Sequence, residues 1–322
     1  MSWHADGIKY CLLSWNDLEC QETEYHRGRK VPISGLFNWA NVLAGASAFP
    51  RSQEEMSKFN LIHLNVTAEN LNLIPKIVRL VDRTKTKLIF NVDYAIELWP
   101  RNFRHPELFL QQLNQADFIF AVEEKMAEIL SLALHRTVPC IPHPTDTVGL
   151  KETYFSAERD NQIGVAIHQY DGAVTAPFYA LREQNHFQTV AFGGISKPED
   201  YYHLFDFIAP YRSFEDNMKM VSRLFAIVES YTIHSYGRVS VEAAALGIPV
   251  IGSTIVGSIK RCFPETSFDD PMDALHIIKH IVQLQNPAFY RHVSQKAMKE
   301  ADYYSFENSR RRMIKFITEE QS

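Results

Sequence analysis

A chain of 322 residues and 37.1 kDa is too long for one ordinary hydrophobic core and suits two domains of about 150 residues each. Because 46% of the residues are apolar, disorder over most of the chain is excluded. A net charge of -5 and a pI near 6.2 argue against a nucleic-acid-binding protein that relies on a basic face.

Two further features bear on the compartment. No apolar run approaches the roughly 20 residues that a membrane-spanning helix needs, and the amino terminus lacks a basic segment followed by an apolar stretch. The cysteines, Cys11, Cys20, Cys140 and Cys262, show no CxxC spacing, as expected of reduced thiols. We therefore expect a cytoplasmic protein, and the sequence leaves peripheral membrane contact open.

Short β-rich apolar runs alternate with helical patterns, which is typical of βα units and parallel sheets. In the first half, strands are predicted at residues 8–15, 61–65, 87–92, 118–122 and 138–141, and helices at 35–48, 71–82 and 123–134. These elements predict one doubly wound unit. The long connection 16–34 follows the first strand, where ligands of α/β sheets gather, so we expect it to contact a substrate.

Residues 141–160 carry Pro142 and Pro144 and lose apolar periodicity, so they are predicted to connect two units. A second series follows, with strands predicted at 163–167, 188–192, 206–208, 225–228 and 250–252, and helices at 176–184, 214–222, 239–246, 271–285 and 287–302. A last helix is predicted after Ser305, a residue type that favours the N-cap.

The most informative stretch is 235–253, SYGRVSVEAAALGIPVIGS, which predicts a loop, a helix, a tight turn and a buried strand. Gly237 lets the chain turn into the helix and Gly247 ends it. Within the helix, Glu242 lies three residues after Val239 and four before Leu246, so it shares a stripe with apolar residues expected to face the core.

A carboxylate on such a stripe is costly unless it is paired. One carboxylate can accept hydrogen bonds from both hydroxyls of a ribose, and the N–H groups of the same helix's first turn can hold the attached diphosphate. The alternative is that Glu242 only complements the helix dipole, worth ~0.3 to 1 kcal/mol, and pairs with a nearby arginine. The pattern by itself leaves both interpretations open.

The stretch 235–253 resembles the donor-site signature of retaining GT-B glycosyltransferases in the large family that includes sucrose synthases and many mannosyl- and glucosyltransferases, the family 4-like enzymes. That signature has a Glu, seven intervening residues and a second Glu, then an alanine-rich helix, Gly, Pro-Val and a strand. Its second Glu, which binds the donor ribose in the family, falls on Glu242. Weaker similarities are ISGLFNWANVLAGAS, FNLIHLN, ADFIFAVEEKMAEIL and IPHPTDT.

The resemblance implies an α/β GT-B fold of two doubly wound, Rossmann-like domains facing a cleft. We expect residues 1–155 to form the acceptor-side domain, 156–302 the donor-binding domain, and 303–322 a helix that crosses back to the first domain. The implied reaction is sugar transfer from a nucleotide-sugar donor with retention, without a metal or other cofactor. The leaving diphosphate is then stabilised by helix N–H groups and cations.

The chain departs from the family pattern at three places. His234 stands where the family has its first Glu, beside the transferred sugar. The basic pair that grips the donor phosphates is not visible in residues 163–174, which offer only His168 and Gln169. The family's histidine in the N-domain loop is also absent from residues 90–99, where Asp93 is the nearest polar candidate. We therefore assign the catalytic positions to His234 and Asp93.

The remaining expected site residues belong to donor and acceptor. The donor-binding set is Ser235, Tyr236, Gly237, Arg238, Val239 and Glu242, with Gly194 and Lys197 at the exit of a strand. On the acceptor side we expect Gly35 and Trp15. Arg238, Lys197 and Lys260 are the cations considered as replacements for the phosphate grip. The base, the sugar, the acceptor (glycan, lipid, protein or small molecule) and the oligomeric state stay open.

Two other functions remain as alternatives: a GT-B-shaped binding or scaffold subunit that has lost catalysis, favoured by the departure at His234, and a nucleotide-sugar epimerase.

His276 and His280 lie four residues apart on a predicted helix, but no third ligand accompanies them, so we expect no metal site. The sequence has no GxGxxG after a predicted strand, no P-loop and no GxSxG elbow, so dehydrogenase, NTPase and serine hydrolase functions lose their main support.

Overall fold

The computed structural model describes residues 7–13, 35–48, 50, 52–68, 70–98, 105–167, 180–181, 186–193, 204–209, 213–229 and 231–319. The contacts divide the chain into two compact units. The N-terminal unit contains Met1–Thr145 and Phe306–Ser322, and the C-terminal unit contains Asp146–Ser305.

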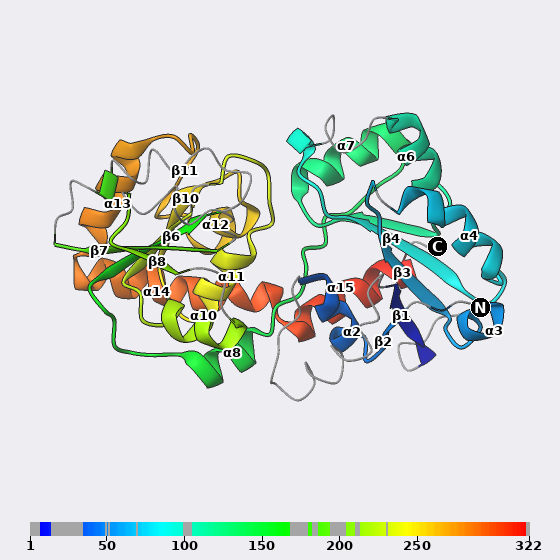
Figure 1. Cartoon of the computed structure of the whole chain (residues 1–322), viewed down its shortest axis with the longest axis horizontal. Helices are drawn as coiled ribbons and strands as arrows, with labels where there is room; N and C mark the ends of the chain where they lie inside the picture. Colours follow the sequence, from blue (N-terminus) through cyan, green and yellow to red (C-terminus); the bar gives the residue numbers. More distant parts are fainter. Residues whose placement is uncertain are drawn as a thin grey trace. The chain divides into compact units, whose positions relative to one another are not determined.

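A parallel sheet with the order β2-β1-β3-β4-β5 forms the centre of the N-terminal unit (Figure 1). Its strands are β1 (Tyr10–Leu13), β2 (Ala46–Ala48), β3 (Leu61–Asn65), β4 (Lys87–Val92) and β5 (Phe118–Ala121). The helices are α2 (Asn38–Val42), α3 (Gln53–Met56), α4 (Ile74–Leu80), α6 (Pro106–Leu113), α7 (Glu124–Leu134) and α15 (Phe306–Glu319), with short 3-10 turns η2 (Gly35–Phe37), η3 (Leu71–Leu73) and η4 (Ile96–Leu98).

The two faces of this sheet differ in chemistry, because alternate residues of a strand point to opposite faces. One face is mostly aliphatic, with Phe90 of β4 among its side chains, and packs against α3, α4, α6 and α7. The other carries aromatic and polar side chains and is covered by α2 and α15. On that face Phe120 meets Trp39 of α2 at 6.0 Å between ring centroids, and Phe118 meets Phe316 of α15 at 5.7 Å.

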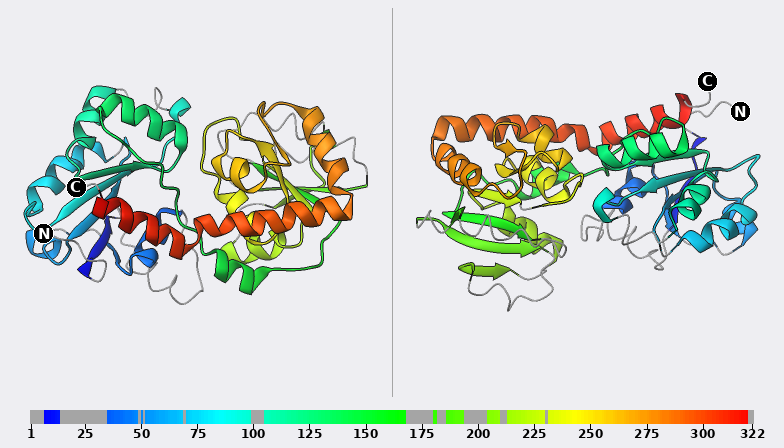
Figure 2. Two further views of the ribbon diagram at one scale, coloured as in Figure 1. Left: turned by 180° about the vertical axis from the view of Figure 1, so that it is seen from behind. Right: turned by 90° about the horizontal axis from the view of Figure 1, so that it is seen from above.

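The C-terminal unit has a parallel sheet with the order β11-β10-β9-β6-β7-β8. Its strands are β6 (Gln162–Ile167), β7 (Gln188–Gly193), β8 (Phe207–Ala209), β9 (Ala226–Glu229), β10 (Val250–Ser253) and β11 (Ser267–Phe268). The helices are α8 (Thr147–Tyr154), α10 (Phe214–Val221), α11 (Arg238–Ala245), α12 (Gly257–Cys262), α13 (Ala274–Leu284) and α14 (Pro287–Ala301), with the 3-10 turn η6 (Asp302–Tyr304). Figure 2 shows the long α14 running along this unit, where it packs against α11 and α12.

The predicted α/β class with parallel sheets is confirmed, and several local predictions are wrong. The helix predicted at 35–48 ends at Val42, because Ala44 adopts a positive φ of 49° and β2 follows. The strand predicted at 138–141 makes a single bridge, between Cys140 and Ala121. The connection predicted at 141–160 contains α8, which begins where Asp146 accepts a hydrogen bond from the Gly149 N–H.

The helix predicted at 176–184 lies outside the described residues except for 180–181. Among the helices that are described, none has the length and apolar character that a bilayer crossing requires.

Candidate functional site

The loop before α11 and the start of that helix form the centre of the candidate site. Gly237 adopts φ 80° and occupies the N-cap position of α11. A Cβ atom at this position would collide with Ser258 Oγ and Val256 Cγ1. Only glycine adopts this backbone conformation without strain and leaves room for these neighbours. The glycine expected from the motif thus sets the direction in which α11 enters the core.

Backbone hydrogen bonds attach this loop to α12. The Gly257 N–H donates to the Ser235 carbonyl at 2.8 Å, and the Ser258 N–H donates to the Tyr236 carbonyl at 3.0 Å. Ser258 Oγ also donates to the Gly237 carbonyl at 2.8 Å. Three successive carbonyls of the loop therefore have donors from one neighbouring helix, and the loop is held in a defined conformation.

The start of α11 has no side-chain cap, because its N-cap residue is Gly237. In the same unit, α10 and α13 begin on Ser213 and Asp273, whose side chains accept hydrogen bonds from first-turn N–H groups. A helix start without such a cap has backbone donors and a partial positive charge for an anionic ligand. This geometry suits a phosphate group.

Glu242 is 6% exposed and lies one turn into α11. Its Oε1 accepts a hydrogen bond from Arg238 Nε at 2.7 Å, and the Arg238 guanidinium lies over the Phe214 ring at 5.8 Å. The arginine pairing foreseen as the alternative is therefore present. The described residues give Glu242 Oε2 no hydrogen bond, so this oxygen retains its capacity to accept one from a ligand.

His234 lies half-buried in the same loop, five residues after the end of β9. Sequence reasoning missed Glu229, the last residue of β9, which is 2% exposed and pairs in register with Gly252 of β10. An acidic residue at the end of the apolar run AIVE is the signal that identifies it. Both residues lie at the carboxyl end of the sheet, where open α/β sheets bind their ligands.

The other residues expected from the sequence to belong to the site divide into two groups. Ser235, Tyr236 and Val239 lie with Gly237 and Arg238 around the start of α11, and Lys260 is exposed on α12. Gly194, Lys197, His168, Gln169, Trp15 and the connection 16–34 lie outside the described residues.

In the N-terminal unit, Asp93 directly follows β4 and joins a polar cluster with His143 and Trp39. Asp93 Oδ2 is 3.0 Å from His143 Nε2, and the Trp39 indole N–H donates to His143 Nδ1 at 3.2 Å. Asn38 Nδ2 donates to the Pro144 carbonyl at 2.6 Å. The segment that begins at Gly35 supplies Asn38 and Trp39, so the structure connects it with Asp93. Sequence reasoning missed His143 and Trp39.

Beneath this cluster, on the same face of the sheet, lies a buried histidine. His63 Nε2 is 2.8 Å from Asn91 Oδ1, and Tyr10 donates its hydroxyl to His63 Nδ1 at 2.5 Å. Burial lowers the pKa of His63 to about 3, against the opposing effect of the Asn91 hydrogen bond. Burial also raises the pKa of Tyr10 well above its ordinary value. Both side chains are therefore neutral near pH 7.

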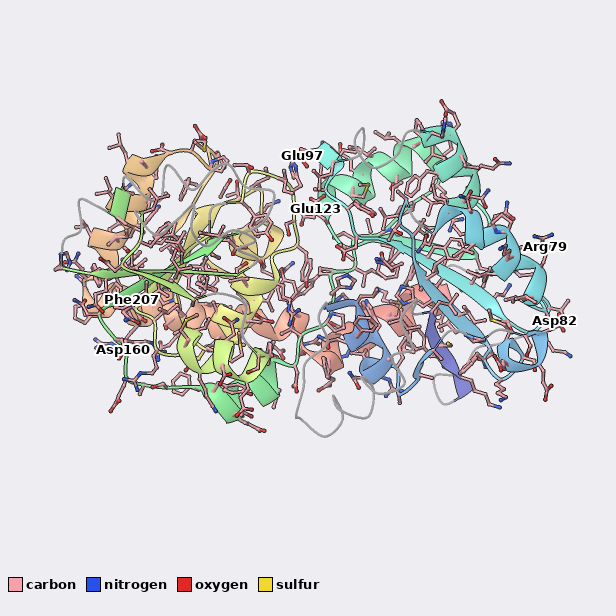
Figure 3. The ribbon with its side chains drawn as sticks, in the orientation of Figure 1. Arg79, Asp82, Glu97, Glu123, Asp160 and Phe207 are labelled. Carbon is pink, nitrogen blue, oxygen red and sulfur yellow. The ribbon has the colours of Figure 1, made fainter. Side chains whose placement is uncertain are left out.

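Two labelled carboxylates mark the carboxyl end of the N-terminal sheet (Figure 3). Glu97 comes from η4 after β4, and Glu123 precedes α7 after β5, whereas Arg79 and Asp82 lie at the opposite end of the unit. Glu123 accepts from the N–H groups of Lys125 and Met126, so it caps α7 and is committed to the backbone.

Within the described part of the chain, no three His, Cys, Asp or Glu side chains converge as a metal site. His276 Nδ1 lies 2.6 Å from Asp273 Oδ2, and the rings of His276 and His280 both stack on Phe268, with interplanar angles of 22° and 17°. These histidines form part of the packing between α13 and β11.

Comparison by sequence finds no matching family model and no matching curated protein. Comparison of structures finds sucrose-phosphate synthase from Thermosynechococcus elongatus, with a TM-score of 0.70 and 16% identity over 97% of this chain and 98% of that protein. HepE from Anabaena, in complex with UDP, aligns with a TM-score of 0.69 and 12% identity over 97% and 100%. An alpha-glucosyltransferase in complex with UDP-glucose and DNA aligns at 0.61 and 13% over 92% and 96%.

These structures cover almost the whole chain and have the GT-B fold, so the predicted fold is confirmed. Membership of the family 4-like enzymes within that fold stays a prediction.

Proposed function

We propose that the protein is a glycosyltransferase that binds a nucleotide-sugar donor on its C-terminal unit and transfers the sugar to an acceptor. One observation about α11 carries the proposal. This short helix begins without a side-chain cap, and it also holds the buried carboxylate of Glu242, which has one available oxygen. The structural similarity to HepE, which was determined with UDP and with UDP-glucose, supports a nucleotide sugar as donor.

In the proposed complex, Glu242 Oε2 accepts a hydrogen bond from a ribose hydroxyl. The first-turn N–H groups of α11 and the side chain of Arg238 contact the diphosphate. A guanidinium has five N–H donors, so Arg238 can hold Glu242 through Nε and still contact an anion. Gly194 and Lys197 complete the proposed donor set from the strand exit that follows β7.

During transfer, the bond between the anomeric carbon and the diphosphate oxygen breaks, a bond to the acceptor oxygen forms, and the proton of the acceptor hydroxyl passes to the leaving diphosphate. The α11 N–H groups and Arg238 stabilise the negative charge that develops on the leaving diphosphate. His234 contacts a hydroxyl of the transferred sugar, because an imidazole ring can form hydrogen bonds with such groups. We propose retention of configuration and independence from metal ions, as in the enzymes that the donor motif resembles.

The proposal is tested by a thermal-shift screen with UDP, GDP, ADP, CMP and their sugars. A ligand that binds only the folded protein raises the melting temperature by mass action. We expect one nucleotide class to raise it and the corresponding sugar conjugate to do so as well. No shift with any nucleotide at millimolar concentration contradicts the proposal. Binding without turnover favours the scaffold subunit, and an epimerised donor identifies an epimerase.

A further inference from the structure

The polar cluster in the N-terminal unit carries a second proposal, which rests on the proposed function. We infer that Trp39, His143 and Asp93 form a binding site for a hydroxyl group of the acceptor. Asp93 contacts the acceptor, while His143 and Trp39 are positioning residues. The acceptor class that this site fits is a neutral sugar or polyol.

Hydrogen-bond chemistry fixes the proton on His143. An indole N–H can only donate, so His143 Nδ1, which lies 3.2 Å from Trp39 Nε1, acts as the acceptor. The ring proton of the neutral imidazole therefore sits on Nε2, from which it is donated to Asp93 Oδ2 at 3.0 Å. Trp39 therefore donates to His143, and His143 donates to the Asp93 carboxylate.

The solvent exposure of the three side chains shows which of them can contact a ligand. Trp39 is fully buried, and the His143 side chain is 1% exposed with both ring nitrogens engaged, whereas the Asp93 side chain is 33% exposed. The hydrogen bond from His143 is the only one that Asp93 receives from the described residues. Asp93 Oδ1 can therefore accept a hydrogen bond from outside the cluster.

Buried side chains of the sheet support Trp39, His143 and Asp93. The Trp39 ring contacts His63 edge to face at 6.5 Å, and His63 is fixed by Asn91. Asn91 lies on β4 two residues before Asp93, and its Nδ2 donates to Asn65 Oδ1 at 2.9 Å. A carboxylate supported by side chains with fixed rotamers can present its free oxygen in one direction.

A second observation supports a missing donor at this place. Asn38 lies next to Trp39 on α2 and donates to the Pro144 carbonyl, beside His143. Its Oδ1 atom is buried and has no hydrogen-bond partner among the described residues. An unsatisfied buried acceptor is unfavourable, so the packing around Asn38 leaves a hydrogen-bond requirement that the described side chains do not meet.

Charge limits the class of acceptor. A fixed carboxylate attracts a hydroxyl as hydrogen-bond donor and repels an anionic group placed beside it. We therefore expect neutral probes such as glycerol, methyl glucoside and methyl mannoside to occupy the site, and glycerol phosphate to bind poorly.

The first experiment measures sugar transfer to these probes for the parent, Asp93→Asn and Trp39→Phe. Asp93→Asn keeps the shape and an oxygen for the His143 N–H but removes the charge, and Trp39→Phe removes the indole N–H. Glu128→Gln, an exposed carboxylate on α7, is the matched control. We expect Asp93→Asn to lower kcat/KM for transfer by about tenfold or more, while the affinity for the donor nucleotide stays at the parent's value. Transfer at the parent's rate by folded Asp93→Asn overturns the proposal.

The second experiment is NMR of the histidine ring nitrogens, with the His143 pattern assigned by its loss in His143→Gln. We expect the parent to show the Nε2–H tautomer, a shift of this pattern on addition of a neutral probe, and a mixture of tautomers in Trp39→Phe. A merely structural role of the cluster would lower thermal stability without any response to the probe. An Nδ1–H tautomer in the parent, or no response to any neutral probe, overturns the proposal.

These results separate the two proposals. The parent could bind and hydrolyse a nucleotide sugar while the NMR signals of His143 do not change with any neutral probe. That result would contradict the proposed acceptor site and leave the proposed donor function intact. If the parent binds no nucleotide, the proposed function fails first.

Discussion

Glu242 combines burial, an arginine partner and one oxygen without a partner among the described residues. A structural ion pair explains the first two features. It does not explain why the carboxylate lies in the first two turns of a helix whose start also lacks a side-chain cap. A ligand with adjacent hydroxyl and phosphate groups accounts for all of these features together.

Replacing Glu242 tests this interpretation directly. Glu242→Gln keeps an oxygen for the Arg238 Nε but removes the charge that strengthens a bond to a ribose hydroxyl. We expect the Kd of the nucleotide to rise about tenfold or more, because charged hydrogen bonds contribute ~1.5 to 3 kcal/mol. Titration calorimetry of the folded variant provides the measurement. Glu307→Gln, from an exposed Glu–Arg pair on α15, is the control and should bind as the parent does. Equal nucleotide affinity in Glu242→Gln and the parent would contradict the proposed ribose contact.

His63 predicts how the N-terminal unit responds to acid. Its pKa is about 3 in the folded state and near ~6.5 in an unfolded chain. Between these values the unfolded state binds more protons, so the stability that is present near pH 7 is lost as the pH falls below about 6.5. We expect a loss of up to about 1.4 kcal/mol per pH unit from this residue.

Fluorescence can isolate this effect, because all four tryptophans, Trp3, Trp15, Trp39 and Trp99, belong to the N-terminal unit. Urea unfolding followed by tryptophan emission at several pH values gives the slope for the parent and for His63→Gln. The slope should be shallower in His63→Gln and unchanged in the exposed His292→Gln. Identical slopes in the parent and His63→Gln would show that another group controls the acid response.

The start of α11 is the element on which the proposed donor site depends. Its conformation requires a glycine at 237, where φ is 80° and neighbouring side chains fill the space of a Cβ atom. We expect Gly237→Ala to destabilise the C-terminal unit by about 1 to 2 kcal/mol from backbone strain, with a further cost from the displaced neighbours.

Circular dichroism of the urea transition measures this loss, and calorimetry should show weaker nucleotide binding as the loop moves. Gly257→Ala is the matched control, because a Cβ atom at 257 meets its nearest neighbour, the Ser235 carbonyl, at an ordinary 3.7 Å. A Gly237→Ala variant as stable as Gly257→Ala, with parental affinity, would contradict the assigned role of this turn.

The last helix belongs by its contacts to the N-terminal unit, although about 160 residues of the other unit separate it in sequence from the rest of that unit. Phe316 of α15 packs against Phe118 and Phe120 on the aromatic face of the sheet. We expect Phe316→Ala to lower the stability of this unit by about 3 kcal/mol, measured by tryptophan emission in urea. Lys315→Ala on the exposed side of α15 is the control. Equal transitions for the two variants would mean that α15 does not stabilise the sheet.

Sequence pattern predicted the elements whose signal is local. Strands β3, β4 and β6 are short, largely apolar runs, and the position of Glu242 follows from helical spacing. Edge strands β2 and β11 were missed because three and two residues carry no periodicity.

The pairing of Asp93 with His143 and Trp39 was missed for a different reason. The contact between Trp39 and His143 joins residues 104 positions apart, and no local pattern encodes such a pair. Asp93 was identified only by resemblance, and its histidine partner required the fold.

Sugar transfer by this protein can be tested through hydrolysis of the donor without an acceptor, using the nucleotide sugar that raises the melting temperature. Chromatography would follow release of the nucleoside diphosphate and free sugar in the parent and in Glu242→Gln, with excess EDTA present. We expect slow release in the parent that continues under chelation, and at least about tenfold less release in Glu242→Gln at limiting donor. A bound donor that stays intact, or release that requires added manganese or magnesium, would contradict this expectation.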